Sequence, residues 1–285
     1  MSVKKQGVDY VLPFLKWPGG KRWLTKKIVP IMKDSSFINY YEPFLGGGSV
    51  FFALSPKKAF LSDLNNELIS TYKTVRNSPN SLQIRLKEFE QSKEAYYKIR
   101  ATQFQNQKDI AARFLYLNRL AFSGMYRVNQ KGEFNVPYGG RRADILWEQG
   151  LITNASKVLK KATLKSASYE TMIVKAQEQD LVYCDPTYTV AHNDNGFIRY
   201  NEKVFHWSDQ KKLAKLCKEA GNRGVQVIVS NAAHPCIAKL YHPYKPITIK
   251  RHTCISRMGA GRKLVEEYIF IINGNRTKYL EKLQQ

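Results

Sequence analysis

The sequence YYEPFLGGGSVFFALSPKKAFLSD, residues 40 to 63, decides the fold because two strand-like apolar runs flank a glycine turn and a short helix-like segment. With its neighbours it divides into five segments: a strand at 38 to 43, a turn at 44 to 49, a short helix at 50 to 55 that stops at Pro56, a strand at 58 to 63 and a helix at 65 to 75. Alternating strands and helices of this length are typical of βαβ units. We therefore predict an α/β fold with a parallel sheet.

A second block with the same alternation begins near residue 160. Its expected elements are an apolar strand before Asp185, a helix at 208 to 224 with Ser208 as N-cap, a buried parallel strand at 225 to 231, and two closing strands within 244 to 254 and 264 to 274. Residues 77 to 158 differ, because they have helical patterns and no strand followed by a glycine turn. We predict one domain formed by residues 1 to 76 and 159 to 285, with residues 77 to 158 as an inserted domain.

The charge of the chain indicates the class of its partner. The 285 residues include 46 Lys and Arg against 23 Asp and Glu, which gives a net charge of +23. Such a surplus favours a polyanion, and nucleic acid is favoured over an anionic membrane because no basic amphipathic helix stands out. A soluble basic surface without such a partner is the alternative.

Cysteine spacing and hydropathy bear on compartment and metal content. The four cysteines include no C-x-x-C pair and the five histidines show no metal-ligand spacing, so we predict free thiols and no metal. There is no signal-peptide pattern and no apolar run of about 18 residues. We expect a cytoplasmic protein that spans no membrane, and no obligate protein partner is evident.

The glycine turn and the acid after the second strand suggest a cofactor. Three glycines, Gly46 to Gly48, let the backbone approach a ligand closely, and the helix that follows offers free N–H groups. The spacing matches neither the G-x-x-x-x-G-K-[ST] phosphate loop nor G-x-G-x-x-G. Asp63 ends the second strand, where an acid can bind a ribose hydroxyl pair or cap a helix. The pair fits a nucleoside without phosphates better than a nucleotide.

Two further stretches gain meaning only in combination. LVYCDPTYTV, residues 181 to 190, ends an apolar strand on Asp185, Pro186, Thr187 and Tyr188. These residue types are common in the tight turns that follow strands, which is the simplest interpretation. FLKWPGGKRW, residues 14 to 23, similarly has the simple interpretation of a basic turn before an amphipathic helix.

Taken together, these motifs resemble a known family. FLKWPGGKR, YYEPFLGGGSVFF, SDLN and LVYCDPTY occur in the order and spacing of the Dam-like (D12 class, alpha group) N6-adenine-specific DNA methyltransferases, which use S-adenosylmethionine (SAM). FLYLNRLAFSGMYRVNQKGEFNVPYG is similar to the target-recognition hairpin of that family, and SRMGAGRKLVEEYIF extends the resemblance over nearly the whole chain. The resemblance implies a Rossmann-like methyltransferase sheet with a helical and β-hairpin recognition insertion at residues 77 to 158. It also implies that double-stranded DNA is the partner and S-adenosylhomocysteine the product.

The resemblance assigns cofactor and catalytic residues. The SAM pocket is expected to be lined by Trp17, Lys21, Phe44, Gly46, Gly48, Asp63 and Asp185. Asp185 to Tyr188 match the catalytic tetrapeptide Asp-Pro-Pro-Tyr. Adenine N6 is a poor nucleophile, and hydrogen bonds to the Asp185 carboxylate and the Pro186 carbonyl would direct its lone pair at the sulfonium methyl. Tyr188 would stack on an adenine that has left the duplex. The opposite wall of the adenine pocket would come from Phe197, Tyr200 or Phe205.

The recognition residues are expected on the hairpin and beside it. Strand alternation places Tyr126 and Val128 on one face and Met125 and Arg127 on the other. An arginine presented in the major groove can read guanine, with about 1 to 3 kcal/mol of discrimination. The resemblance assigns DNA contact to Lys16, Phe122, Ser123, Met125, Arg127, Asn129 and Pro137, with Phe122 as a wedge and GATC as the target. Candidates for phosphate contact are Lys157, Lys160, Lys161, Arg251, Arg257 and Arg262.

Two positions depart from the family pattern. Thr187 stands where the family usually has a second proline, which would stiffen the turn through its fixed φ. Ser123 differs from the asparagine of the GATC enzymes. Three alternatives therefore stay open: an RNA adenine-N6 methyltransferase, a protein glutamine methyltransferase, and a non-catalytic DNA-binding regulator that keeps the methyltransferase fold.

Overall fold

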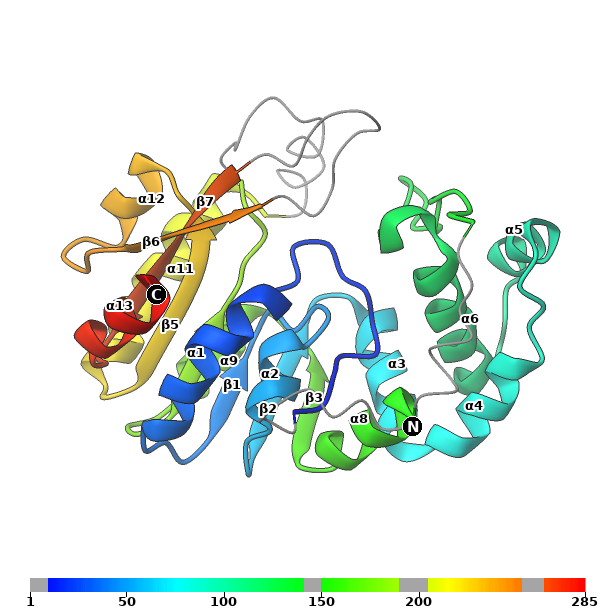
Figure 1. Cartoon of the computed structure of the whole chain (residues 1–285), viewed down its shortest axis with the longest axis horizontal. Helices are drawn as coiled ribbons and strands as arrows, with labels where there is room; N and C mark the ends of the chain where they lie inside the picture. The colour runs from blue at the N-terminus through cyan, green and yellow to red at the C-terminus, as the bar shows by residue number, and fades with distance from the viewer. Residues whose placement is uncertain (1–9, 141–149, 190–204, 253–263, 285) are drawn as a thin grey trace. The chain divides into compact units, whose positions relative to one another are not determined.

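A computed structural model of the chain describes residues 10 to 140, 150 to 189, 205 to 252 and 264 to 284 (Figure 1). The described strands form one seven-stranded sheet with the order β3-β2-β1-β4-β5-β7-β6. Their bounds are β1 Tyr40–Glu42, β2 Ala59–Asp63, β3 Ala162–Ser166, β4 Leu181–Cys184, β5 Gln226–Ala232, β6 Ile247–His252 and β7 Leu264–Ile272.

The pairing confirms the predicted parallel sheet. Strands β1 to β5 pair in parallel, whereas β7 runs antiparallel between β5 and β6. The strand order reverses between β1 and its neighbour β4, so the carboxyl ends of these two strands flank a topological switch point. Ligands of open α/β sheets bind at such a point, because the loops that leave the two strands diverge there.

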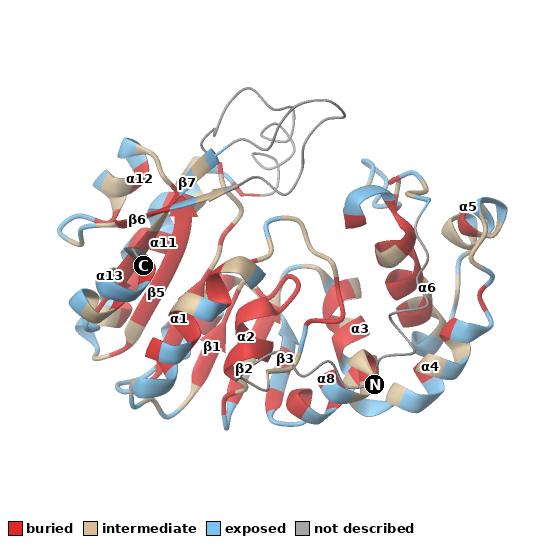
Figure 2. Cartoon of the chain, in the orientation of Figure 1, coloured by how far each residue is buried: buried red, intermediate tan, exposed pale blue. Residues whose placement is uncertain are grey.

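One face of the sheet is buried by helices α9 (Tyr169–Lys175) and α11 (Trp207–Asn222). Val182 and Phe270 of the sheet belong to the same buried cluster as Ile173 of α9 and Leu213 of α11. Strands β1 and β5 are buried along most of their length (Figure 2). Apolar burial of this kind is the main favourable term in folding, and it fixes the strands whose ends carry the candidate site. The remaining helices here are α12 (Pro235–Leu240) and α13 (Arg276–Gln284).

The N-cap of helix α11 lies two residues earlier than predicted. His206, and not Ser208, is the N-cap, and the helix starts at Trp207. The reason is a reciprocal pair of bonds, in which the backbone N–H of His206 donates to Oδ2 of Asp209 at 2.7 Å and the N–H of Asp209 donates to the His206 carbonyl at 3.0 Å. This reciprocal pair fixes the first turn of α11.

The remaining elements are helical. They are α1 Arg22–Asp34, α2 Ser49–Leu54, α3 Asn66–Asn77, α4 Pro79–Lys87, α5 Lys93–Ala101, α6 Gln107–Leu120, the 3-10 turn η1 Phe122–Gly124 and α8 Leu151–Leu159. The chain breaks at Pro79 as predicted, because this proline occupies the first turn of α4. A further break precedes α5, where the Ser92 side chain accepts the N–H of Ala95 at 3.1 Å.

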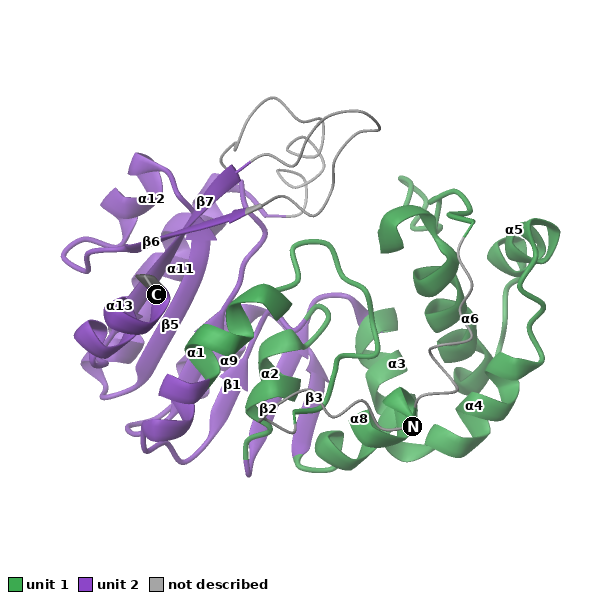
Figure 3. Cartoon of the chain, viewed as in Figure 1, with its two compact units in different colours: residues 1–29, 46–56, 67–161 green, residues 30–45, 57–66, 162–285 purple. Residues whose placement is uncertain are grey.

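The chain divides into two compact units (Figure 3). Unit 1 comprises residues 1–29, 46–56 and 67–161, and unit 2 comprises residues 30–45, 57–66 and 162–285. The whole sheet belongs to unit 2, whereas the glycine turn and the predicted recognition hairpin belong to unit 1. The units are defined by packing, and the functional boundaries at residues 77 and 158 stay a prediction.

Three observations concern cysteines, metals and membranes. Cys184, Cys217 and Cys236 are free thiols as predicted, and Cys254 lies outside the described residues. In the part of the chain that the structure describes, no group of three or more His, Cys, Asp and Glu side chains is arranged to hold a metal ion. No helix among these residues is both long enough and apolar enough to cross a membrane.

Candidate active site and DNA-reading surface

The tetrapeptide Asp185 to Tyr188 directly follows β4, the central strand of the sheet, at its carboxyl end. Pro186 is buried, whereas Asp185, Thr187 and Tyr188 are partly exposed. A simple surface turn would leave these residues to solvent. Here three of them are instead held by buried polar side chains from neighbouring elements of unit 2.

The Asp185 carboxylate is oriented from β5. The hydroxyl of Ser230, which is completely buried, donates to Oδ1 of Asp185 at 2.8 Å. The Tyr183 hydroxyl lies 3.1 Å from the Ser230 hydroxyl. Since a serine hydroxyl has a single hydrogen and Ser230 gives it to Asp185, Tyr183 is the donor in this second bond. The carboxylate is thus fixed by a chain of two hydroxyls.

The Thr187 backbone is held from α11. The side chain of Gln210 donates through Nε2 to the Thr187 carbonyl at 3.2 Å, and its Oε1 accepts from Nδ2 of Asn231 at 2.9 Å. Gln210 and Asn231 are both completely buried. Consecutive strand residues point to opposite faces, so Ser230 and Asn231 of β5 hold the tetrapeptide from the two faces of the sheet.

Tyr188 is anchored from β7. Its hydroxyl donates to Oε2 of Glu267 at 3.0 Å, and Oε1 of the same buried carboxylate accepts from Nε of Arg251 on β6. Burial, followed by the negative charges of Glu267 and Asp185, raises the pKa of the Tyr188 hydroxyl well above its usual range. The hydroxyl therefore stays protonated and remains a donor. Arg251, a candidate for phosphate contact in the sequence, makes this ion pair through Nε.

The glycine turn in unit 1 packs on Trp17. Gly46 has a φ of +45°, and a Cβ there would lie 2.8 Å from Cδ1 of the Trp17 ring, while one on Gly47 would lie 2.9 Å from the Trp17 Cβ. The carbonyl of Gly46 accepts the Tyr72 hydroxyl at 3.0 Å, and Gly48, with a φ of +64°, is the N-cap of α2. The glycines are required here by a close protein contact, which joins two motifs of the predicted cofactor pocket.

The two lysines of the first motif have fixed positions. Lys21 is buried, and its ammonium donates to the Gly19 carbonyl at 3.1 Å. The backbone of Lys16 is held by the Asn118 side chain of α6 through two hydrogen bonds. The Lys16 N–H donates to Oδ1 of Asn118 at 3.0 Å, and Nδ2 of Asn118 donates to the Lys16 carbonyl at 2.7 Å. This part of unit 1 is therefore ordered by buried polar contacts and not by charge alone.

The remaining predicted cofactor residues lie in unit 2. Phe44 follows β1 and stacks on Tyr169 with a ring separation of 5.3 Å, while Phe205 meets it edge-on at 5.7 Å. Asp63 ends β2, is partly exposed, and its Oδ1 accepts the N–H of Asn65 at 3.0 Å. Phe205, one of the three candidates for a wall of the adenine pocket, is buried in this aromatic cluster. The other two candidates for that wall, Phe197 and Tyr200, lie outside the described residues.

The predicted recognition hairpin is present as a turn with isolated bridges and not as two regular strands. Val128 bridges to Phe134 and Ala121 to Tyr138, both antiparallel. The turn closes with the N–H of Gly132 donating to the Asn129 carbonyl at 3.0 Å. Backbone bonds from the Asn129 N–H to the Glu133 carbonyl at 2.9 Å and from the Asn135 N–H to the Arg127 carbonyl at 3.0 Å flank the Val128 bridge. Within the turn, the Asn129 side chain accepts the N–H groups of Lys131 and Glu133. Asn129, predicted to touch DNA, thus also shapes this turn.

The two faces of the hairpin differ as predicted. Tyr126 stacks on Trp17 at 5.3 Å and donates its hydroxyl to Glu67 at 3.4 Å. Arg127 is exposed, and its Nε donates to Oδ1 of Asn135 at 2.8 Å. The face with Tyr126 therefore packs on Trp17, and the opposite face presents the ordered Arg127 guanidinium. Met125, which is predicted on the same face as Arg127, is partly exposed.

Phe122 and its neighbours form an exposed, strained turn. Phe122 is 50% exposed, and Ser123 beside it has a φ of 54°, which a residue other than glycine adopts at a cost. Pro137 is exposed, and its carbonyl accepts the Phe122 N–H at 2.9 Å. An exposed aromatic side chain held by a strained turn is typical of an interaction site.

Arg119 on α6 is a further candidate that the sequence patterns did not indicate. Nε of Arg119 is buried and has no hydrogen-bond partner within the described residues. Burial, and then the positive charge of Arg22, lowers the pKa of the Arg119 guanidinium to about 10. Arg119 is partly buried, and a guanidinium there beside a second arginine suits an anionic ligand, because burying an uncompensated charge is costly. Only the three-dimensional proximity of the two arginines reveals it.

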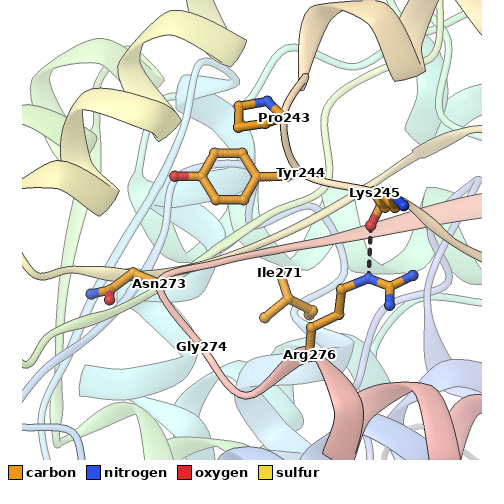
Figure 4. A pocket seen from close by; sticks show the side chains of 7 residues that line it. All are labelled: Pro243, Tyr244, Lys245, Ile271, Asn273, Gly274 and Arg276. Atoms are coloured by element: carbon orange, nitrogen blue, oxygen red, sulfur yellow. Dashed lines mark hydrogen bonds between the residues drawn. The ribbon is translucent and has the colours of Figure 1, made fainter.

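A pocket in unit 2 is lined by none of the candidate site residues described above (Figure 4). Its lining includes Ile271, which pairs with Ile228 near the amino-terminal end of β5. Arg276 spans it and donates through Nε to the Lys245 carbonyl at 3.0 Å. Its charged side chain serves to join two chain segments, and the pocket is at the wrong end of the parallel strands for a ligand of this fold.

An α/β sheet with an anchored Asp-Pro-Thr-Tyr at its switch point is typical of the open α/β proteins that bind a ligand at the carboxyl ends of their strands. Comparison with known proteins then identifies the family. The model of the D12 class N6 adenine-specific DNA methyltransferases matches residues 17 to 255, and the chain belongs to this family.

Individual relatives cover most of the chain. A type II methyltransferase of Lactococcus lactis subsp. cremoris, M1.LlaDCHI, is 34% identical over 285 residues, covering 96% of this chain and 100% of the relative. The type II methyltransferase M.MjaIII of Methanocaldococcus jannaschii is 34% identical, with 85% of this chain and 92% of the relative covered. A DNA adenine methylase of Vibrio cholerae is 35% identical over 264 residues, covering 90% and 94%.

Proposed function

We propose that the protein is a site-specific DNA adenine methyltransferase that transfers a methyl group from SAM to N6 of a flipped-out adenine in duplex DNA. The observation that carries this proposal is the tetrapeptide at the carboxyl end of β4, whose carboxylate is fixed by Ser230 and whose tyrosine is fixed by Glu267. Membership of the D12 class and the similarity to DNA adenine methylases support it. The cytoplasm is the proposed location.

The residues present fit SAM as the cofactor. Asp63 presents a partly exposed carboxylate at the end of β2, and β1 alone separates β2 from β4 in the sheet. A carboxylate at this edge suits a ribose hydroxyl pair. The turn that follows β1 begins with Phe44 and continues into glycines, including Gly46 and Gly48, that lack a phosphate-loop spacing. We assign cofactor contact also to Trp17 and Lys21 of the first motif. When bound, SAM supplies an electrophilic methyl group on a sulfonium.

The tetrapeptide then performs the chemistry on adenine. The Asp185 carboxylate and the Pro186 carbonyl accept the two N6 hydrogens, so the nitrogen lone pair is withdrawn from the ring and pointed toward the methyl group. Because Ser230 fixes the carboxylate before the substrate arrives, little reorganisation is needed. The Tyr188 ring stacks on the extruded base, and its hydroxyl stays bound to Glu267.

The residues of unit 1 support duplex DNA as the substrate. Arg127 is exposed and ordered by Asn135, as direct reading of a guanine requires. Phe122 is exposed enough to enter the base stack, and Arg119 and Arg22 suit a phosphate. We propose that residues 77 to 158 read the DNA, with Lys16, Ser123, Met125, Asn129 and Pro137 as further contacts, and that the target is GATC.

Methyl transfer in solution tests the proposal. Purified protein is incubated with isotopically labelled SAM and a duplex that contains one GATC, and the digested DNA is analysed for the modified base. We expect N6-methyladenine with the wild type and none with Asp185→Ala. Asp34→Asn, which removes an exposed carboxylate paired with Lys278 at 3.0 Å, should leave transfer unchanged. Modification of another base, or equal transfer by Asp185→Ala, would overturn the assignment.

A further inference from the structure

Two completely buried amide side chains have no part in the function proposed above. Asn231 ends the apolar run of β5, and Gln210 lies in the first turn of α11. Nδ2 of Asn231 donates to Oε1 of Gln210 at 2.9 Å, and Oδ1 of Asn231 accepts the N–H of Ala232 at 2.8 Å. The amide of Gln210 then reaches the Thr187 carbonyl at 3.2 Å. The two side chains therefore form a relay that ends on the tetrapeptide.

The relay is rigid at its base. Burying an amide is unfavourable unless it is hydrogen-bonded, so each member of the relay is constrained to keep its partner. The reciprocal bonds between His206 and Asp209 fix the turn of α11 that carries Gln210, because Asp209 immediately precedes it. Any rotation of the Gln210 side chain would break both of its bonds. The Thr187 carbonyl is thus attached to an element that cannot easily follow a moving loop.

The relay holds Thr187, and the tetrapeptide residues Asp185 and Tyr188 on either side of it are each held by a different side chain. Asp185 is fixed by Ser230 and Tyr188 by Glu267, and Thr187 lies between them. Threonine has no ring to restrict its φ, and its ψ sets the direction of its carbonyl. The bond from Gln210 therefore restrains the peptide plane that follows Thr187, whereas a proline would restrain φ. Rotation of this peptide plane would change the position of the Tyr188 ring relative to the Asp185 carboxylate. Errors of about 1 Å in the placement of reacting groups cost about 100-fold in rate.

We infer that Gln210, held by Asn231, is a positioning residue that fixes the Thr187 carbonyl and thereby sets the spacing between the Asp185 carboxylate and the Tyr188 ring. This inference rests on the proposed function. Gln210 touches neither base nor cofactor in this scheme. It acts through the peptide bond that follows Thr187, and its loss should lower the rate of methyl transfer without lowering the affinity for SAM or DNA.

The test compares two routes to a rigid Thr187. Gln210→Met removes the donor at nearly constant size, and we expect kcat to fall about 10- to 100-fold while KM for SAM and Kd for DNA stay within about twofold. Thr187→Pro keeps the carbonyl and stiffens the turn at the adjacent torsion, because the proline ring fixes φ near −65°. Added to Gln210→Met, it should restore at least about half of the lost activity on a logarithmic scale, which a merely structural loss would not allow.

A matched control separates positioning from stability. Asn39 donates its side-chain amide to Oδ1 of Asp180 at 2.8 Å, immediately before β4 begins and thus at the other end of that strand. Asn39→Leu should lower the melting temperature as Gln210→Met does, with kcat unchanged. Three results would overturn the inference. One is a kcat of Gln210→Met within twofold of wild type, and another is an equal loss of kcat in Gln210→Met and Asn39→Leu. The third is no recovery of kcat when Thr187→Pro is added to Gln210→Met. A wild-type protein that transfers no methyl group would instead refute the proposed function.

Discussion

Tyr188→Phe separates the two roles assigned to Tyr188. It removes the hydroxyl that donates to Oε2 of Glu267 at 3.0 Å and keeps the aromatic ring. A hydrogen bond to a charged group contributes about 1.5 to 3 kcal/mol. Glu267 is completely buried, so water cannot replace the lost donor, but Arg251 still pairs with Oε1 of the same carboxylate. We therefore expect the lower part of this range, a loss of about 1.5 to 2 kcal/mol in the free energy of unfolding.

Urea unfolding and base-flipping fluorescence measure the two roles together. The unfolding midpoint should fall in Tyr188→Phe, whereas a 2-aminopurine at the target position should still brighten on binding, because the ring that stacks is kept. With Glu267→Gln as the second variant, the double mutant should lose clearly less than the sum of the single changes. Additive losses, or an unfolding free energy of Tyr188→Phe within about 0.5 kcal/mol of wild type, would refute the anchoring of Tyr188 by Glu267.

Four further predictions concern other parts of the chain. Gly46→Ala should weaken SAM binding and shift tryptophan fluorescence, whereas Gly132→Ala, with a φ of +78° and no atom within 4 Å of the added Cβ, should cost backbone strain alone. Arg127→Ala should lose about 1 to 3 kcal/mol of discrimination against a duplex with the guanine replaced, measured by competition binding. Arg119→Ala should reduce the slope of log K against log salt by about 1. Burial raises the pKa of Tyr41 to about 12, above its unfolded value of about 10. The contribution of Tyr41 to the free energy of unfolding should therefore be constant below pH 10 and fall as the pH rises toward 12, which urea unfolding midpoints would show.

Local patterns sufficed to predict the frame of the fold. The glycine turn after an apolar run, and the acid at residue 63, located β1, α2 and β2 to within two residues at their ends. The apolar run before Asp185 correctly indicated a buried strand, because parallel strands covered on both faces have little polar sequence. These features depend on residues that are close together in the sequence, so they can be recognised from one sequence alone.

The polar contacts that hold the site were not predictable in the same way. Ser230, Gln210 and Glu267 lie 45, 23 and 79 positions from their partners in the tetrapeptide, so no spacing rule connects them. The available signals were weak: a Ser-Asn pair closing an apolar strand, and an acid inside another. The N-cap of α11 was misplaced for a related reason, since histidine is a less usual cap and the reciprocal bond with Asp209 decided the helix start.

The measurement that most directly tests the central claim is long-read detection of N6-methyladenine in DNA from a methylation-free host that expresses the chain. The account predicts modified adenines at one short motif, GATC, with the wild-type protein, and none with Asp185→Ala at equal expression. Methylation at another motif would retain the chemistry and contradict the assignment of Arg127 to a guanine of GATC. If no adenine is modified although the purified protein is folded and binds SAM and duplex DNA, the claim that this tetrapeptide catalyses methyl transfer is wrong.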